Sequence, residues 1–397
     1  MKKFLSLFLV LTVLMMAFSV VLADDFKVGV ILVHDENSGY DQAHIEGAIG
    51  AAEALGLPTD PEHLRFEYNV PESEICYDKA VDLAEAGYNL IISDSYGHQA
   101  YMMEAAREYP DVHFIASTGD TAWKEGIDNV SNIFPHTYES RYVSGVVAGM
   151  KLKELMDAGT VTDPHIGYVG AYPYAEVVSG YTGFFLGVRS IVPEAYMDVI
   201  YTNSWYDPNA EAAAAEALIS RGCVIIGQHA DSTGAPSAIQ AAQDKGATVF
   251  SVGYNIDMRA VAPTAALTSA QNNWVVLYEY MMGKAMNGEE LPKDYSAGYA
   301  SDAVMISDLG ESCAEGTAEA VEAAIAGIKD GTVNVFDTAN FTVGGETVTS
   351  AFALDTDGDW VTDTEEVIID GVFHESEVIS APYFSLRIDG ITELTNE

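Results

Sequence analysis

Short runs of β-branched and apolar residues alternate along the chain with longer stretches whose apolar residues recur at helical spacing. The apolar run at 26–34 is followed by a helical stretch at 41–57, and the same order repeats up to residue 117. This alternation predicts βαβ units, which build a mostly parallel sheet with helices on both faces. The expected strands are 26–34, 64–70, 89–95 and 112–117, and the expected helices are 41–57, 72–87 and 97–109.

The alternation restarts after another apolar run at 129–134, which predicts a second lobe of the same kind. We therefore expect an α/β protein of two doubly wound, Rossmann-like lobes with a ligand cleft between them. The chain is expected to cross between the lobes near 134–136 and again near 253–255. The second lobe is predicted from strands at 165–171, 196–202, 223–229 and 247–253, and helices at 138–157, 175–192, 209–221 and 235–245, with a further helix at 272–286.

These crossings predict how the chain is divided between the two lobes. After residues 1–23, the N-terminal lobe is expected to comprise 24–135 plus about 254–290. The C-terminal lobe is expected to comprise 136–253 plus about 291–345, and 346–397 to be a C-terminal extension. From Thr332 onward the sequence is strand-poor and rich in Gly, Thr and Asp, so we expect this tail to wrap the surface.

The first residues have the features of a secretory signal peptide. Lys2 and Lys3 precede an apolar run that ends in small residues before Asp24, and we expect cleavage after Ala23. The alternative is an uncleaved membrane anchor, because the run is long enough to span a bilayer. The first cysteine is Cys76, so this N-terminal segment contains no lipobox cysteine. We expect an exported protein, in the periplasm or on the cell exterior.

Charge and cysteine content narrow the function classes. The chain has 60 acidic and 18 basic residues, a formal net charge of −42. Such a charge disfavours nucleic acid and anionic membrane surfaces as partners. The three cysteines, Cys76, Cys223 and Cys313, form no disulfide framework and lack metal-site spacing, although one bridge is left open. No cofactor is expected.

Ligands of doubly wound sheets bind beyond the carboxyl ends of the strands, which singles out the loops that follow each expected strand. Several of these loops place an aromatic ring beside a short polar side chain, a combination that suits a planar, heteroatom-rich ligand. The candidate ligand-binding residues in these loops and in the nearby 270–274 stretch are Tyr40, Tyr96, Gly97, Tyr174, Trp205, His229, Asp231, Asn255 and Trp274.

The same loops carry a resemblance to a known family. The segments EYPDVHFI (108–115), IGYVG (166–170), GFFLGVRS (183–190), TNSWYDP (202–208) and QHADS (228–232) occur in an order and spacing that resemble the basic membrane protein family. These are the purine-binding receptors of ABC importers. The resemblance runs from about 26 to 343. It implies a type I periplasmic binding protein fold, no enzymatic activity, and a monomer that delivers its ligand to a permease and an ATPase.

Departures from the family pattern bear on the ligand. Nucleoside-binding members carry an Asp at the strand exit that is read here as Gly253-Tyr254-Asn255, and a Lys shortly after the position of Ser269. The resemblance implies that these two residues hold ribose hydroxyls. This chain lacks both, which favours a free purine base, with adenine first, over a nucleoside.

Each candidate residue also has a purely structural interpretation. Tyr40 and Trp205 are expected to stack on the ligand from different lobes, but rings in such loops also cap cores. Asp231 can accept hydrogen bonds from a base, or cap the next helix. Asn255 suits a purine edge or a hinge turn. The pair His229 and Asp231 lacks a third metal ligand, so no metal is predicted there.

Three further alternatives stay open. The tail segment from Asp355 to Glu366 resembles a calcium loop but has Trp360 where Gly is required, so an acidic surface turn is the preferred interpretation. A sugar- or signal-binding receptor would have the same fold, because fold does not fix the ligand. A hydrolase is disfavoured because no Walker loop, His-Glu-x-x-His or Gly-x-Ser-x-Gly motif is present.

Overall fold

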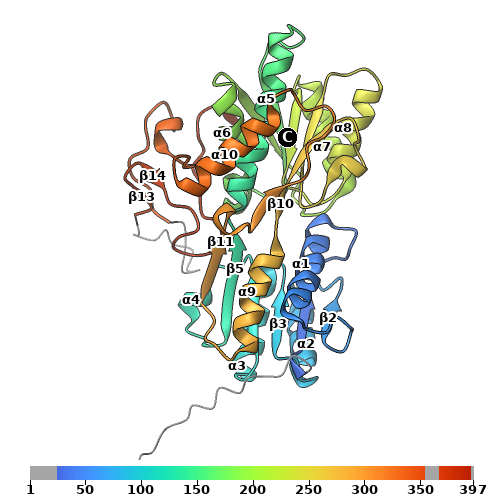
Figure 1. Ribbon diagram of the computed structural model, residues 1–397, viewed down its shortest axis with the longest axis vertical. Coiled ribbons are helices and arrows are strands. Elements are labelled where there is room, and N and C mark those ends of the chain that lie inside the picture. Colours follow the sequence, from blue (N-terminus) through green and yellow to red (C-terminus); the bar gives the residue numbers. More distant parts are fainter. Residues whose placement is uncertain (1–24, 354–365, 395–397) are drawn as a thin grey trace, which may run out of the picture.

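The computed structural model describes residues 25–353 and 366–394, and it shows two α/β lobes stacked along the long axis (Figure 1). The first sheet has six strands in the order β11-β5-β4-β3-β1-β2, all parallel. Its central strands are buried along their whole length, as expected for a parallel sheet covered by helices on both faces. The strands are β1 (Val28–Ile31), β2 (Leu64–Glu67), β3 (Leu90–Ser93), β4 (His113–Ser117), β5 (Val130–Pro135) and β11 (Asp294–Ala297), and the helices are α1 (Gly39–Leu55), α2 (Glu74–Glu85), η2 (Tyr96–His98), α3 (Gln99–Glu108), α4 (Ala122–Glu125) and α9 (Trp274–Met286).

The second sheet repeats this arrangement with seven strands in the order β12-β10-β9-β8-β6-β7-β15. Its strands are parallel except β12, which runs antiparallel to β10. The strands are β6 (His165–Gly170), β7 (Tyr196–Tyr201), β8 (Ile225–Gln228), β9 (Phe250–Tyr254), β10 (Ala266–Asn272), β12 (Val304–Ile306) and β15 (Ile391–Leu394), and the helical segments are α5 (Thr137–Asp157), α6 (Ala175–Ile191), α7 (Pro208–Ser220), α8 (Gly234–Asp244), η3 (Met258–Ala260), η4 (Tyr299–Ser301) and α10 (Thr317–Asp330).

Within the described residues the chain passes between the two sheets three times, after Pro135, after Asn272 and after Ala297. The sequence interpretation instead placed a return to the first lobe near 253–255, so it assigned 266–272 to the wrong sheet and 294–297 to the second lobe. The physical reason is that β10 is another short buried strand, and its pattern does not specify which of two similar sheets it joins.

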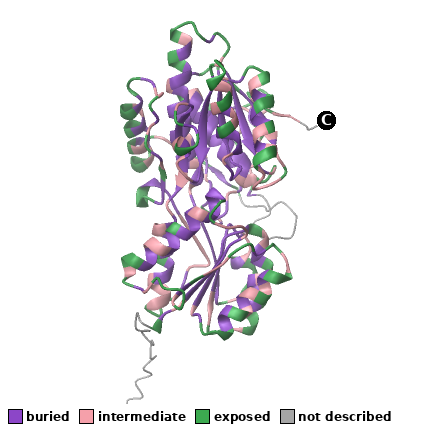
Figure 2. Cartoon of the chain, turned by 90° about the vertical axis from the view of Figure 1, so that its right-hand side faces the viewer, coloured by how far each residue is buried: buried purple, intermediate pink, exposed green. Residues whose placement is uncertain are grey.

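The tail corrects a second expectation, because it is built into the second lobe and does not only wrap the surface. Its rings Phe336, Phe341, Phe373 and Phe384 are buried in the core of that lobe. The short strands β13 (Ile368–Ile369) and β14 (Val372–Phe373) form a small ladder, η5 (Thr338–Asn340) precedes them, and β15 extends the second sheet beside β7. Figure 2 shows buried residues concentrated along both sheets.

No helix among the described residues is both long enough and apolar enough to span a membrane. The expected signal peptide and its cleavage site lie outside the described residues. Cys76, Cys223 and Cys313 are all free thiols, so the bridge that the sequence left open does not form.

Candidate ligand-binding site

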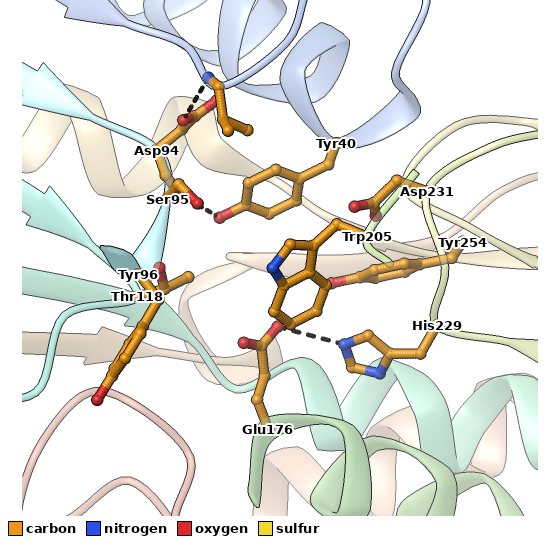
Figure 3. A pocket seen from close by; sticks show the side chains of 11 residues that line it. Tyr40, Asp94, Ser95, Tyr96, Thr118, Glu176, Trp205, His229, Asp231 and Tyr254 are labelled. Atoms are coloured by element: carbon orange, nitrogen blue, oxygen red, sulfur yellow. Dashed lines mark hydrogen bonds and ion pairs between the residues drawn. The ribbon is translucent and has the colours of Figure 1, made fainter. Parts of the chain in front are cut away.

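A pocket lies between the two lobes, where the carboxyl ends of both sheets face each other (Figure 3). Both sheets share the order in which the first strand lies between the second and the third, and ligands of such sheets bind where this order reverses. Its cavity volume is about 30 Å³, well below the usual size range of small-molecule sites, so the side chains that line it must move apart to admit a ligand. It is lined by Val33, Tyr40, Asp94, Ser95, Tyr96, Thr118, Glu176, Trp205, His229, Asp231 and Tyr254.

The first lobe contributes Tyr40 from the first turn of α1. Ser38 caps this helix by accepting a hydrogen bond from the backbone N–H of Asp41, which fixes where the turn begins. The Tyr40 hydroxyl donates to the carbonyl oxygen of Asp94 at 2.8 Å. Its ring packs edge-on against His44, with centroids 4.4 Å apart. The ring is therefore held by both a hydrogen bond and packing, so it presents a rigid surface to the pocket.

Asp94 follows β3 and is fully buried at the first-lobe side of the pocket. One of its carboxyl oxygens accepts a hydrogen bond from the backbone N–H of Val33 at 3.1 Å. Burial, together with the nearby charge of Asp41, raises the pKa of Asp94 well above its usual range. Asp94 thus adds a carboxyl group whose protonation depends on its partners.

The second lobe contributes Asp231, which lies at the junction of the two lobes. Its backbone N–H donates to the carbonyl oxygen of Trp205 at 2.9 Å, and its own carbonyl oxygen accepts from Gly39 of the first lobe at 3.1 Å. The side-chain amide of Asn255 donates to the Asp231 carboxylate at 2.9 Å. Asn255 has a φ of +61°, a left-handed conformation that asparagine tolerates well. Asn255 therefore positions Asp231 without lining the pocket.

Burial raises the pKa of Asp231 well above its usual range, and the charges of Glu211 and Asp41 raise it further. A buried carboxyl group of this kind gains most from a ligand that donates N–H groups to it, because such donors favour its ionised form. Its electrostatic environment therefore favours a ligand rich in hydrogen-bond donors.

His229 and Glu176 form a polar pair at the edge of the pocket that belongs to the second lobe. The His229 Nε2 atom lies 3.2 Å from the Glu176 carboxylate, as the dashed line in Figure 3 shows. Burial lowers the pKa of His229 well below its usual range, and the charge of Arg141 lowers it further. Burial also raises the pKa of Glu176 to about 7, although Arg141 opposes this effect. His229 is consequently a neutral imidazole, and Glu176 is poised between its neutral and ionised forms near pH 7.

Tyr254, at the end of β9, gives the pocket an aromatic wall that is supported from behind. The guanidinium group of Arg141 lies 3.7 Å from the centroid of the Tyr254 ring, and one of its nitrogens donates to the carbonyl oxygen of Gln228. Arg141 is itself buried and does not line the pocket. Among the described lining residues none is lysine or arginine, whereas three carry carboxyl groups. The lining is therefore acidic and aromatic.

The structure brings most of the sequence-selected residues together at this pocket. Tyr40, Tyr96, Trp205, His229 and Asp231 line it, and Asn255 contacts Asp231.

Besides Asn255, three selected residues do not line the pocket. Trp274 is 1% exposed in the first-lobe core, where it begins α9 and packs on Gly47 of α1. Tyr174 is 51% exposed and stacks on Tyr172. The backbone N–H of Gly97 donates to the Glu72 carboxylate. The structure does not place these three candidates on the pocket, because the sequence could not determine which way each one faces.

Six lining residues were not selected from the sequence: Val33, Asp94, Ser95, Thr118, Glu176 and Tyr254. Ser95, Thr118 and Tyr254 lie in strand-exit loops that the topology rule had already identified, so a complete reading of those loops would have found them. Asp94 lies one residue earlier, and Glu176 lies in the first turn of α6. Neither carries a local signal, because only the fold directs both carboxyl groups into the same space.

The described residues do not support a metal ion at this pocket, because His229 and Asp231 are not among the grouped His, Cys, Asp and Glu side chains that could share an ion. Most of the acidic tail segment lies outside the described residues. Its last member, Glu366, accepts hydrogen bonds from Ser350 and from the backbone of Ala351.

Comparison with known proteins identifies the protein family of this chain. The model of the family described as ABC transporter substrate-binding protein PnrA-like matches residues 39–309. The chain belongs to this family. Its members bind substrates for import outside the cytoplasm and are not enzymes.

Two curated relatives of this chain are named for different ligands. A purine-binding protein of Brucella abortus is 36% identical over 256 residues, which cover 64% of this chain and 67% of that protein. A protein of Haloferax volcanii that is named as an ABC transporter glucose-binding protein is 31% identical over 241 residues, or 60% of this chain and 57% of that protein. The chain thus aligns with only about half to two thirds of the length of these relatives.

Solved structures agree on the fold. A solute-binding protein of an ABC transporter from Aeropyrum pernix aligns with a TM-score of 0.65 at 19% identity, over 77% of this chain and 92% of that chain. A solute-binding protein from Conexibacter woesei aligns with a TM-score of 0.62 at 20% identity, over 78% and 97%. This similarity confirms the expected two-lobed α/β architecture of periplasmic binding proteins.

Proposed function

We propose that this substrate-binding protein captures a purine base, with adenine as the preferred ligand, and delivers it to a membrane permease and its ATPase. The observation that supports this most directly is the lining of the pocket, which combines the rings Tyr40, Trp205 and Tyr254 with the carboxyl groups of Asp94, Glu176 and Asp231. Flat rings stack on a base, and carboxylates accept hydrogen bonds from its amino and ring N–H groups.

A free base is favoured over a nucleoside by the residues at two positions that are expected to hold ribose in nucleoside-binding relatives. The positions at which nucleoside-binding relatives are expected to carry an Asp and a Lys correspond here to the strand exit Gly253-Tyr254-Asn255 and the stretch 270–274. Tyr254 presents a ring to the pocket, and Trp274 is buried in the first-lobe core. Buried ribose hydroxyls would lack charged partners from these positions, at a cost of roughly 1–3 kcal/mol for each unpaired group.

Titration calorimetry of the purified protein with adenine and with adenosine tests this proposal. We expect adenine to bind at least about tenfold more tightly than adenosine, a difference of about 1.4 kcal/mol, which lies within the cost given above for one unpaired hydroxyl. Tighter binding of adenosine would refute the preference for a base. The protein is also expected to act as an exported monomer and to turn over no purine when purified alone.

A sugar is the alternative ligand, favoured by the name of the Haloferax relative and by the ability of aromatic rings to stack on sugars. The same calorimetry with glucose separates the two. Tight binding of glucose with no binding of adenine or adenosine would overturn the purine proposal.

A further inference from the structure

A second group of side chains that could bind a metal ion lies at the amino ends of strands in the second sheet, opposite the end that faces the pocket. His165 begins β6, Asp198 lies in β7, and Cys223 lies two residues before the start of β8. β6 pairs with both β7 and β8. All three residues lie at or near the amino ends of parallel strands, whereas the pocket between the lobes lies at the carboxyl ends. Their nitrogen, oxygen and sulfur atoms lie within 4.8 Å of one another.

The three side chains are almost fully buried, with exposed fractions of 5%, 3% and 1% in chain order. The His165 Nε2 atom lies 3.0 Å from the Asp198 carboxylate, yet it makes no hydrogen bond of acceptable geometry. Its ring is held in place by stacking on Tyr196, with centroids 4.4 Å apart and planes 14° apart. A buried imidazole nitrogen this close to a carboxylate but without a well-aligned hydrogen bond to it is unusual and calls for an explanation.

The neighbours of the cluster include one cation, Arg221, that competes for Asp198. The Cys223 thiol has only a weak hydrogen bond to the carbonyl oxygen of Ile166, at 3.3 Å. The Arg221 Nε atom donates to Asp198 at 2.7 Å, but the Arg221 side chain is 48% exposed. Arg221 therefore covers the cluster from the solvent side. It can move outward, or keep one carboxylate oxygen while a metal ion takes the other.

We propose that His165, Asp198 and Cys223 form a zinc-binding site, separate from the ligand pocket, with water as the fourth ligand. An imidazole nitrogen, a carboxylate oxygen and a thiolate are the donors that zinc prefers, whereas calcium and magnesium require oxygen. Tetrahedral zinc places its ligand atoms about 3.3–3.8 Å apart, given its bond lengths of about 2.0–2.3 Å, so small side-chain movements suffice. The thiol releases its proton to solvent when the ion binds.

The site would join three adjacent strands of the second sheet, so its expected effect is on stability. Zinc bound to the folded state alone raises the melting temperature, by an amount that grows with zinc concentration. Adenine binding should not change, because the ion binds at the amino ends of the strands, whereas the pocket lies at their carboxyl ends.

The test uses the full mature protein, first stripped of metal, with zinc and then cobalt added in the presence of excess calcium to occupy acidic surface sites. We expect one zinc ion per chain and a thiolate-to-cobalt charge-transfer band in the near ultraviolet. The variants Cys223→Ser and His165→Gln should each lose at least tenfold in zinc affinity, and Cys223→Ser should lose the band. Cys313→Ser removes a thiol elsewhere and should keep both.

The variant Arg221→Ala tests whether a cation competes with zinc for the cluster. It removes the competing cation, so it should bind zinc at least as tightly as the wild type if the cluster is a metal site. Circular dichroism and adenine titration establish that each variant is folded. The proposal is overturned if the wild type binds no zinc, if no charge-transfer band forms, or if Cys223→Ser binds zinc as the wild type does.

Discussion

At the scale of single residues, the pocket is a set of aromatic rings beside buried or half-buried carboxyl groups. Tyr40 is fixed by Asp94 and His44, and Asp231 is fixed by Asn255. Trp205 differs, because it is partly exposed and its side chain packs beside the rings of Tyr172 and Tyr174 in its own lobe. Trp205 is therefore the ring whose removal should change ligand binding with the least damage to the fold.

Trp205→Ala should weaken adenine binding by about tenfold or more, because stacking of a base on an aromatic ring contributes roughly 1–3 kcal/mol. Trp123→Ala is the matched control, since Trp123 is an exposed tryptophan that does not line the pocket. Calorimetry on both variants measures the effect. Equal affinities for the two variants would show that Trp205 does not stack on the ligand.

The buried carboxyl groups should make the stability of the unliganded protein depend on pH. Burial raises the pKa of Glu176 and of Glu211 to about 7, from 4.5. Between these values the unfolded chain has released protons that the folded chain still holds, so the free energy of unfolding falls as pH rises. The neutral carboxyl groups thus favour the folded state below about pH 4.5, and this contribution is lost as pH rises through 7.

Glu176→Gln cannot ionise and should remove part of this loss, roughly 1–3 kcal/mol between pH 5 and pH 8. Urea unfolding of the ligand-free protein at several pH values measures it. Glu322→Gln makes the same charge change on the exposed face of α10 and should keep the wild-type slope. A Glu176→Gln slope equal to that of the wild type would contradict the assignment.

At the scale of elements, the second lobe depends on a close contact between α5 and α6. Gly145 and Gly187 face each other there, and a Cβ atom added at Gly187 would lie 2.1 Å from the backbone oxygen of Tyr142. A side chain of any size would force the two helices apart. Glycine at this position is therefore required by the packing distance, although it costs helix propensity.

Gly187→Ala should destabilise the protein by about 1–3 kcal/mol, because the added methyl group overpacks a helix interface that contains backbone atoms. Gly283→Ala in α9 is the control, because its Cβ would lie 3.5 Å from Leu55, an ordinary contact. It should stabilise by up to about 1 kcal/mol through helix propensity. Denaturant unfolding of both variants is the measurement, and a neutral Gly187→Ala variant would contradict the packing argument.

The C-terminal tail connects the two lobes through hydrogen bonds to β11. Ser380 donates hydrogen bonds to Asp294 of β11 from both its backbone N–H and its hydroxyl, at 2.9 Å each. Because β11 belongs to the first sheet and the tail packs in the second lobe, the tail links the two lobes. It is thus structurally part of the receptor, although the family match ends at residue 309.

At the scale of the whole molecule, two lobes joined by three crossings are suited to close around a ligand. In the structure the lobes already touch, through the hydrogen bond from Gly39 to the carbonyl oxygen of Asp231 and through the rings of His34 and Tyr206, 5.6 Å apart. These contacts include one to Asp231, which lines the pocket. They would add to ligand binding by favouring the closed arrangement.

Saturating adenine should reduce the radius of gyration in small-angle scattering relative to the ligand-free protein. It should also raise the melting temperature, because ligand at a hundred times its dissociation constant stabilises the folded state by about 2.7 kcal/mol. Glucose at the same concentration provides the control. A scattering profile unchanged by a ligand that calorimetry shows to be bound would count against closure.

The sequence by itself determined the class of fold, because alternation of strand and helix depends on local periodicity. It also located the site to a set of strand-exit loops, because parallel topology brings those loops together whatever their residues. Tyr40, Trp205, His229 and Asp231 were found in this way. Their residue types suit a planar ligand, and their positions follow from topology alone.

Only the tertiary structure decided matters that depend on direction and on contacts between distant segments. It turned Trp274 into the core and brought Asp94 and Glu176 into the pocket. It also placed β10 in the second sheet, and it brought His165, Asp198 and Cys223 together without any motif in the sequence. Periodicity specifies which side of an element is buried, but which partner covers that side is decided by packing across the whole chain.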